Sequence, residues 1–285
     1  MAVSAKKIAA EPVLEEKKSR GLKGVFRRSF LGIPYALFLA MFVIFPLLLI
    51  VFYAFTDKNG AFTFGNFIAF FSSATNISNL LISVGIAFIT TAVCLLIAYP
   101  VAYILSRFKS ARTYIFVLLF VAPMWINFVL RAYALREILN LLGLLGKTNF
   151  LNVIIGMVYD FLPFMILPLY TTLIKMDKSL EEASADLGGN GAVTFFKVTL
   201  PLSVPGIISG AMMVFLPCMS CYVITDTFGN SKIPLIGKLI ETMFGTASDW
   251  NMGSAIALIM LVIMFVTMLC TGGFKNETAA RGNAL

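Results

Sequence analysis

Two cysteines, Cys218 and Cys221, stand in the segment PCMSC with the CxxC spacing of redox pairs and of half a metal site. Nitrogen and sulfur ligands complete a zinc shell, and the chain has no histidine to supply the nitrogen. The segment also lies in an apolar run, where small side chains suit close packing of helices in a membrane. We therefore interpret both residues, together with Cys94 and Cys270, as packing residues, and we expect no metal site.

The segment GLLGKTN, residues 143–149, ends in the Gly-Lys-Thr of a phosphate-binding loop. That loop requires a glycine five positions before Gly146, where Leu141 stands instead, and no strand precedes it. The common catalytic triads need a histidine and are excluded as well. The sequence thus predicts a chain with no catalytic residue and no cofactor of its own, so any ATP chemistry belongs to another chain.

Two carboxylates fall in or beside apolar runs: Asp160 follows Tyr159, and Asp226 ends a run that contains Tyr222. Ionisable groups at membrane depth are candidates for a substrate path. A tyrosine ring adds about 0.5–2 kcal/mol of attraction for a cation. Each acid also has an alternative interpretation. Asp226 could be an exposed helix end, and Asp160 could make a hydrogen bond or an ion pair with Arg131 inside the membrane. These five residues form the candidate substrate path.

The composition decides which elements position these groups. Apolar residues make up 59% of the 285 residues and charged residues only 13%, about half the charged share of a soluble domain. This composition predicts an integral membrane protein. We expect it to be all-α because the apolar runs show no alternation of period two. Runs of about 20 apolar residues can span the bilayer. Six such runs lie near 30–55, 79–105, 113–135, 150–174, 202–224 and 253–272.

Lysine and arginine residues predict the orientation of the spans. Sixteen of the 22 fall in the N-terminal arm, the two connections 106–112 and 175–200, and the C-terminal tail. Because positive charge accumulates on the cytoplasmic side, we expect both termini and these connections to be cytoplasmic. The net charge of +8 is then an orientation signal and a contact for anionic lipid, with no implication of nucleic-acid binding.

One polar stretch, EEASADLGGNGAVTFFKVTLPLSVPGI at 181–207, is specified more closely than a plain connection needs. Ser179 and Glu182 have the spacing of a capping box at a helix start, and Gly188 suits a helix stop. A second amphipathic piece then leads to Pro201, at the first turn of the fifth span. The pattern indicates a rigid knuckle between two spans. An amphipathic connector lying on the membrane surface is the alternative.

The knuckle resembles the EAA loop of type I ABC-importer permeases. The family pattern is Glu-Ala-Ala, three residues, Gly, nine residues, an aliphatic residue, one residue, and Leu-Pro; Ser184 and Val198 are mild departures here. The resemblance implies a six-helix, MetI-like core whose knuckle docks on a separate ATP-hydrolysing subunit. The residues implied in ATPase coupling are Ser179, Glu182, Ala183, Ser184, Gly188, Val198, Leu200 and Pro201.

Further segments, among them LRAYALREIL, FLPFMILPLY and LPCMSCYVITDTFGN, are similar to the branch of the family that carries spermidine and putrescine. Charges and apolar runs predict a basic arm at 1–29, a first helix at 30–55 and a tail at 273–285. The resemblance covers roughly residues 75–272, the expected permease core with its EAA loop at 179–201. It also implies a bacterial plasma membrane and four kinds of partner. They are two ATP-binding cassette subunits that hold ATP and magnesium, a second homologous permease, an external solute-binding protein, and lipid.

Other functions stay open at this point. An importer for another small solute, such as ferric iron or thiamine, would keep the same architecture. A self-sufficient secondary carrier or channel would not need the knuckle, and the chain shows no internal repeat of the kind such carriers have. An intramembrane enzyme would need a set of catalytic residues, which the sequence does not offer.

Overall fold

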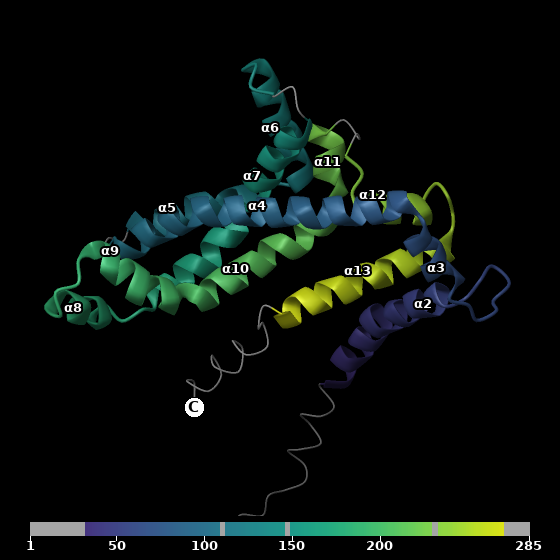
Figure 1. Ribbon diagram of the computed structural model, residues 1–285, viewed down its shortest axis with the longest axis horizontal. Coiled ribbons are helices and arrows are strands. Elements are labelled where there is room, and N and C mark those ends of the chain that lie inside the picture. The colour runs from purple at the N-terminus through teal and green to yellow at the C-terminus, as the bar shows by residue number, and fades with distance from the viewer. Residues whose placement is uncertain (1–31, 109–111, 146–148, 230–232, 271–285) are drawn as a thin grey trace, which may run out of the picture. The chain divides into compact units, whose positions relative to one another are not determined.

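The computed structural model describes residues 32–108, 112–145, 149–229 and 233–270, and helices make up most of them (Figure 1). The chain divides into two units, Met1–Leu49 and Ile50–Leu285. In the first unit the described residues are helical and mostly exposed, and they include the π-helix Ala40–Ile44. The expected basic arm at 1–29 and the expected tail at 273–285 lie outside the described residues.

The helices long and apolar enough to cross a membrane match the six expected spans. Six spans result when one bent pair, Ile115–Trp125 with Phe128–Leu141, is counted as a single span. The other five are Gly32–Ala54, Ala74–Arg107, Asn149–Ile174, Gly191–Ser220 and Trp250–Leu269. The prediction of an all-α membrane protein with six spans is confirmed.

The third span is not the continuous helix expected at 113–135. Helix α5 (Arg112–Val121) passes into a 3₁₀ turn, η2 (Ala122–Trp125), and α6 (Phe128–Leu141) then leaves at a bend of 100°. A proline in η2 interrupts the α-helical hydrogen bonds. The side chain of Asn127 then starts a new helix by accepting from the N–H groups of Val129 at 2.9 Å and Leu130 at 3.4 Å.

The fifth span differs from the expected 202–224 at both ends. It begins at α9 (Gly191–Thr194), continues through the π-helix η3 (Phe195–Thr199) and becomes α10 (Leu200–Ser220). The expected second amphipathic piece is therefore part of the span. The π-helix precedes Pro201, whose missing N–H rules out a regular α-helical bond there. At the other end the chain breaks at Cys221, and α11 (Tyr222–Phe228) follows.

Three helices, α4 (Ala74–Arg107), α7 (Asn149–Ile174) and α10, form the core of the second unit. Two glycines let α10 approach α7: a Cβ at Gly206 would lie 2.6 Å from Thr172 Oγ1, and one at Gly210 would lie 2.7 Å from Met165 Sδ. These two residues form a GxxxG pattern, which is typical of a close helix crossing in membranes.

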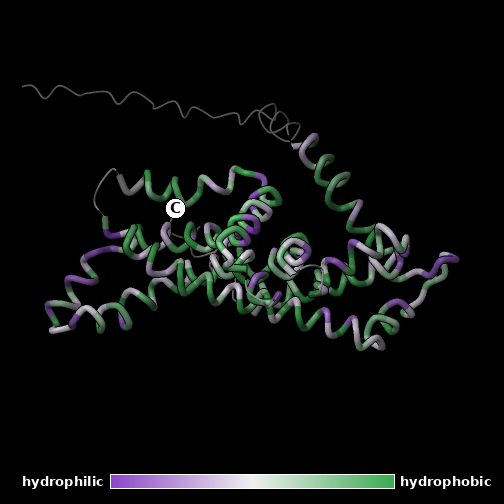
Figure 2. The backbone as a smooth tube through the Cα atoms, turned by 90° about the horizontal axis from the view of Figure 1, so that it is seen from above, coloured by the Kyte–Doolittle hydropathy of each residue, from purple (hydrophilic) through white to green (hydrophobic). Residues whose placement is uncertain are grey.

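Short helices lie at the two ends of this core (Figure 1). Helices α8 (Ser179–Asp186) and α9 lie at one end, and α3 (Gly65–Ser72) and α12 (Ile236–Phe244) lie at the other. Helix α13 (Trp250–Cys270) packs on both α3 and α12. Hydrophobic colour runs along the spans and hydrophilic colour gathers in the connections at the ends (Figure 2). Such a distribution fits a chain surrounded by lipid along its helices.

Candidate functional site

Helix α8, the first helix of the knuckle (residues 179–200), has a cap that differs from the expected one. The carboxylate of Asp177 accepts the N–H of Ser179 at 3.0 Å, and this bond lowers the pKa of Asp177. Ser179 lies in the first turn of α8, whose N-cap position, Lys178, has no side-chain cap. The predicted capping box between Ser179 and Glu182 is therefore wrong, because the acidic residue two positions earlier performs the capping.

The end of α8 is where the sequence placed it. Gly188 has φ +81°, a left-handed conformation that side chains disfavour. The N–H of Gly188 donates to the Ala185 carbonyl and that of Gly189 donates to the Ser184 carbonyl, both at 2.9 Å. This pair of bonds is a Schellman motif, which satisfies the last carbonyls of the helix. A Cβ at Gly189 would lie 2.7 Å from the Ser184 carbonyl oxygen, so a glycine is needed there too.

The knuckle holds its two helices together and presents one surface outward. The hydroxyls of Ser184 and Thr194 lie 2.8 Å apart and join α8 to α9. Glu182 and Ala183 are exposed, and the Leu187 side chain is 90% exposed. Of the other residues implied in coupling, Ser179, Gly188 and Pro201 are exposed, and Val198 and Leu200 are half-buried.

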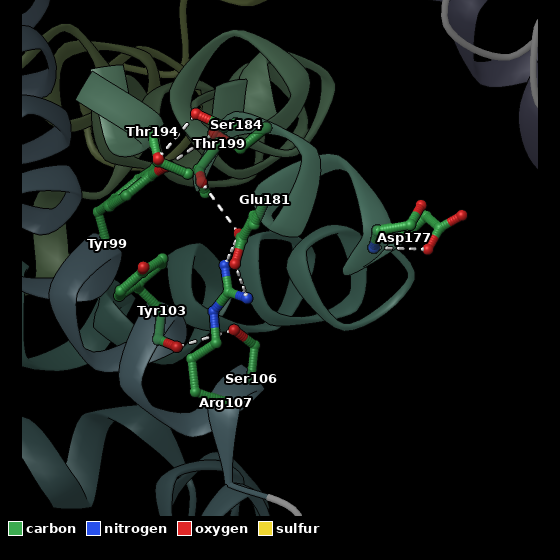
Figure 3. A network of polar contacts seen from close by, with 11 residues as sticks. Tyr99, Tyr103, Ser106, Arg107, Asp177, Glu181, Ser184, Thr194 and Thr199 are labelled. Carbon is green, nitrogen blue, oxygen red and sulfur yellow. Dashed lines mark hydrogen bonds and ion pairs between the residues drawn. The ribbon is translucent and has the colours of Figure 1, made fainter. Parts of the chain in front are cut away.

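An ion pair that the sequence did not indicate ties α8 to a distant span (Figure 3). Arg107, the last residue of α4, donates from both terminal nitrogens to the two carboxylate oxygens of Glu181. Thr199 Oγ1 donates to Glu181 Oε1 at 3.1 Å, and the Arg107 guanidinium carbon lies 4.8 Å from the centroid of the Tyr103 ring. Two features of the sequence could have indicated this ion pair: Arg107 ends an apolar run, and Glu181 is a second acid directly before Glu182.

Within the spans, Arg131 of α6 and Asp160 of α7 form the ion pair that was one of the alternatives for Asp160. Arg131 Nε lies 2.5 Å from Asp160 Oδ1, and the two side chains are 6% and 3% exposed. The other nitrogens donate to the Asp160 carbonyl at 3.2 Å and to the Pro123 carbonyl at 2.8 Å. The Arg131 guanidinium carbon lies 5.6 Å from the centroid of the Tyr159 ring.

This ion pair borders a cavity of about 540 Å³ in the second unit. The cavity lies where two helices are broken, between η2 and α6 and between α10 and α11. Its lining is mostly apolar and includes Trp125, Phe128, Phe161, Phe164, Pro217 and Cys221. The remaining carboxylate oxygen, Asp160 Oδ2, is buried and has no hydrogen-bond partner among the described residues.

The second group of candidates, Asp226 and Tyr222, lies on α11 beside α12. Lys238 Nζ lies 3.2 Å from Asp226 Oδ2 and 3.0 Å from Glu241 Oε2. Hydrogen bonds first to Glu241 and then to Asp226 raise the pKa of Lys238. The ammonium also lies 5.2 Å from the centroid of the Tyr222 ring. The carboxylate and the ring thus already contact a cation of the chain itself, Lys238, and no pattern in the sequence indicated this contact.

The other sequence candidates behave as packing residues where the structure describes them. Cys94 and Cys218 are buried in the core, and Cys221 is half-buried at the cavity; all three are free thiols. The Cys270 side chain and the Gly-Lys-Thr at 146–148 lie outside the described residues. Among the residues that the structure describes, no group of three or more Cys, Asp or Glu side chains is placed to hold a metal ion.

These observations define a class: a multi-pass, all-α membrane protein with a knuckle built between two spans. Residues 96–275 match the family model described as "Binding-protein-dependent transport system inner membrane component". The match covers more than half of the chain, and the chain belongs to this family. It is accordingly a membrane permease of a binding-protein-dependent importer.

Curated relatives align along most of the chain. The chain is 36% identical over 250 residues to the spermidine/putrescine transport system permease protein PotB of Haemophilus influenzae, covering 79% of this chain and 86% of the relative. It is 33% identical over 254 residues to PotB of Escherichia coli strain K12, covering 81% and 91%. A PotB homologue of Mycoplasma genitalium is 29% identical over 234 residues, covering 78% and 82%.

Solved structures share the fold. A chain of a bacterial ABC transporter involved in the import of alginate covers 90% of this chain and 97% of its own length, with a TM-score of 0.68 at 14% identity. A second structure of an alginate ABC transporter, in complex with a pentasaccharide-bound periplasmic protein, gives a TM-score of 0.69 at 12% identity and covers 90% and 96%. The expected fold of a type I ABC-importer permease is confirmed.

Proposed function

We propose that this chain is one permease subunit of an ATP-driven importer of polyamines, spermidine and putrescine foremost. The observation that carries the cargo is the identity of 33–36% to two permeases with that name, over at least 79% of this chain. The partners would be two ATP-binding cassette subunits, a second homologous permease and an external solute-binding protein. ATP and magnesium would be bound by the cassette subunits.

The knuckle supports a division of work between chains. Its exposed surface, with Glu182, Ala183 and Leu187, would dock on a cassette subunit, and closure of the two cassettes on ATP would displace it. In this proposal the termini and the knuckle are cytoplasmic, as the distribution of Lys and Arg indicates. Displacement of the knuckle would switch the two permeases between outward and inward access.

For the substrate path we propose Asp226 with Tyr222 on α11, and Asp160, Tyr159 and Arg131 deeper in the bundle. In the structure Asp226 forms an ion pair with Lys238, whose Nζ lies 3.2 Å from Asp226 Oδ2. A polyamine ammonium would displace Lys238 and take over the same carboxylate and ring. Asp160 would contribute negative charge beside the cavity, while Arg131 keeps that charge compensated when no cargo is present.

The membrane potential gives ATP a specific role in this proposal. An inside-negative potential favours entry of each positive charge by about 2.3 kcal/mol per 100 mV, on the order of 7 kcal/mol for a triply charged polyamine. ATP would then gate the path and prevent leakage. In proteoliposomes without ATP but with a negative potential, polyamine uptake should stay at background, and rapid uptake there would contradict the gated path.

The deciding experiment is the ATPase activity of the reconstituted complex with and without its solute-binding protein. Spermidine, putrescine, ferric iron and thiamine are titrated in turn, with Glu182→Ala and Asp226→Asn beside the wild type. Stimulation by polyamines alone supports the proposal. Stimulation by ferric iron or thiamine keeps the permease and overturns the cargo. Transport by the chain without any ATPase subunit overturns the coupling and indicates a self-sufficient carrier.

A further inference from the structure

Helix α8 is too short to hold its place unaided. Its eight residues make about two turns, and isolated helices shorter than about 12 residues are marginal in water. The contacts of α8 with α9 and η3 join it to neighbours a few residues away in the chain. A displacement received on its outer face therefore needs a firm connection to the spans, or it will be absorbed by bending of the knuckle.

The Arg107–Glu181 ion pair is such a connection. It joins residues 74 positions apart and is bidentate, the geometry in which an arginine–carboxylate pair is strong and directional. Most partly exposed ion pairs contribute little, and a bidentate pair within a network is the exception. Here the side chains of Arg107 and Glu181 are only 29% and 22% exposed.

The same carboxylate also reaches the junction of η3 and α10, inside the fifth span. Glu181 accepts from Thr199, a fully buried residue at the junction of η3 and α10 (Figure 3). One side chain of α8 therefore contacts the end of α4 and the beginning of α10. Because a carboxylate accepts bonds at both oxygens, it can hold both segments at once.

Behind the ion pair, a polar and aromatic wedge fills the space between α4 and α10. The ring of Phe195 packs edge-on against Tyr99 and Tyr103, with centroids 5.6 and 5.7 Å apart. The Tyr99 hydroxyl lies 2.8 Å from Ser203 Oγ. The wedge makes the ends of α4 and α10 one packed body, so a force applied at Glu181 reaches both spans together.

We propose that Arg107 and Glu181 form a strut that transmits displacement of α8 to the end of α4, and that Arg107 is a positioning residue for coupling. Glu181 faces inward to the strut, whereas its neighbour Glu182 faces outward. The inference rests on the proposed coupling of the knuckle to ATP hydrolysis. It adds a route into α4, a span that the chain connects to the knuckle only through α5, α6 and α7.

Charge reversal separates the strut from general stability. Arg107→Glu or Glu181→Arg places like charges together, and the double variant restores an opposite pair in exchanged positions. Asp186→Arg is the matched control, since it reverses an exposed charge on the same helix. If a reversal variant fails to accumulate, Arg107→Gln and Glu181→Gln remove the charge more gently and take its place.

The first readout needs no partner: hydrogen–deuterium exchange of the amides of 182–190 in the purified full chain. We expect exchange to be about tenfold faster in each single variant, equivalent to about 1.4 kcal/mol of lost local stability. The double variant should return to the wild-type rate, and Asp186→Arg should stay there. Wild-type exchange in both single variants, or no recovery in the double variant, would overturn the strut.

The second readout is polyamine transported per ATP hydrolysed by the reconstituted complex. Single variants should still hydrolyse ATP but lose about tenfold in this ratio, and the double variant should recover it. If the wild type is tightly coupled and the single variants transport the same amount of polyamine per ATP, the strut is overturned. A wild-type complex without binding-protein-stimulated hydrolysis overturns the proposed function instead, and the exchange experiment then judges the strut alone.

Discussion

Arg131 on α6 and Asp160 on α7 form an ion pair inside the helical core, with Arg131 Nε 2.5 Å from Asp160 Oδ1. The same guanidinium holds the Pro123 carbonyl at 2.8 Å, so one side chain links α7 to both sides of the break in the third span. That carbonyl also accepts the N–H of Ile126 at 3.2 Å, so the guanidinium is its second donor at the break. The ion pair therefore stabilises the sharp bend between η2 and α6.

Removal of one partner should cost far more than removal of both. Asp160→Asn or Arg131→Gln leaves a buried charge uncompensated, and we expect a loss of about 3–5 kcal/mol in the free energy of unfolding. The double variant Arg131→Met with Asp160→Leu should recover most of it. Thermal unfolding of the purified chain in detergent measures this. Equal midpoints for the single variants and the wild type would contradict a stabilising pair.

The sequence predicted the spans well and the breaks poorly. Apolar runs are long-range signals of composition, and they placed the ends of α7 to within one residue and those of α4 to within five. The bend after Trp125 depends on Asn127 capping a new helix and on Arg131 holding a carbonyl, and neither contact is visible as a pattern along the chain. Similarly, the predicted capping box at Ser179 is absent because the backbone places the Asp177 carboxylate 3.0 Å from the Ser179 N–H.

The candidate site likewise has features that the sequence predicted and contacts that it did not. The stop at Gly188 was predictable because a left-handed residue after a short polar helix favours glycine. Lys238, which contacts both Asp226 and Tyr222, was not, because α11 and α12 meet through a connection whose course the sequence does not encode locally. Pairing of distant charges is a tertiary property, so Arg107 with Glu181 was missed for the same reason.

Asp226 should matter more to transport than the other acid that holds Lys238. With Asp226→Asn we expect about tenfold less polyamine uptake at limiting concentration, because one direct ionic contact is worth about 1.4 kcal/mol or more. Glu241→Gln removes the alternative partner at 3.0 Å and is the matched control, with uptake within about twofold of the wild type. Equal losses in the two variants would assign the effect to Lys238 and remove Asp226 from the path.

The pKa of Lys238 determines the pH range over which its contacts persist. Glu241 and then Asp226 raise this pKa above its ordinary value of 10.5. A raised pKa means that the stabilisation is complete below the unfolded-state pKa and is lost only as the pH rises through the folded-state value. The difference in unfolding midpoint between wild type and Lys238→Met should therefore stay constant from about pH 6 to about pH 9. A difference that shrinks toward pH 9 would show that the pKa of Lys238 is lowered, and would contradict the two stabilising contacts.

The crossing of α7 and α10 should be sensitive to single methyl groups. Gly206→Ala places a Cβ 2.6 Å from Thr172 Oγ1 and 3.2 Å from the Pro168 carbonyl, so the helices must separate. We expect a loss of about 1–3 kcal/mol in stability. Gly85→Ala on α4 is the control, since nothing lies within 4 Å of its Cβ and alanine favours the helix. The thermal unfolding midpoints of the two variants in detergent are compared. Equal midpoints would mean that the crossing of α7 and α10 accommodates the added methyl group.

Gly188 offers a test of the knuckle that leaves every side chain in place. Its φ of +81° costs an alanine about 1–2 kcal/mol, although nothing lies within 4 Å of the added Cβ. Gly188→Ala should therefore fray the end of α8 and weaken binding of the cassette subunit by about five- to thirtyfold. Gly191→Ala also meets nothing within 4 Å, has no left-handed φ, and should bind normally. The affinity of each permease variant for the isolated cassette subunit decides the matter: an unchanged affinity for Gly188→Ala would mean that docking does not depend on the shape of this turn.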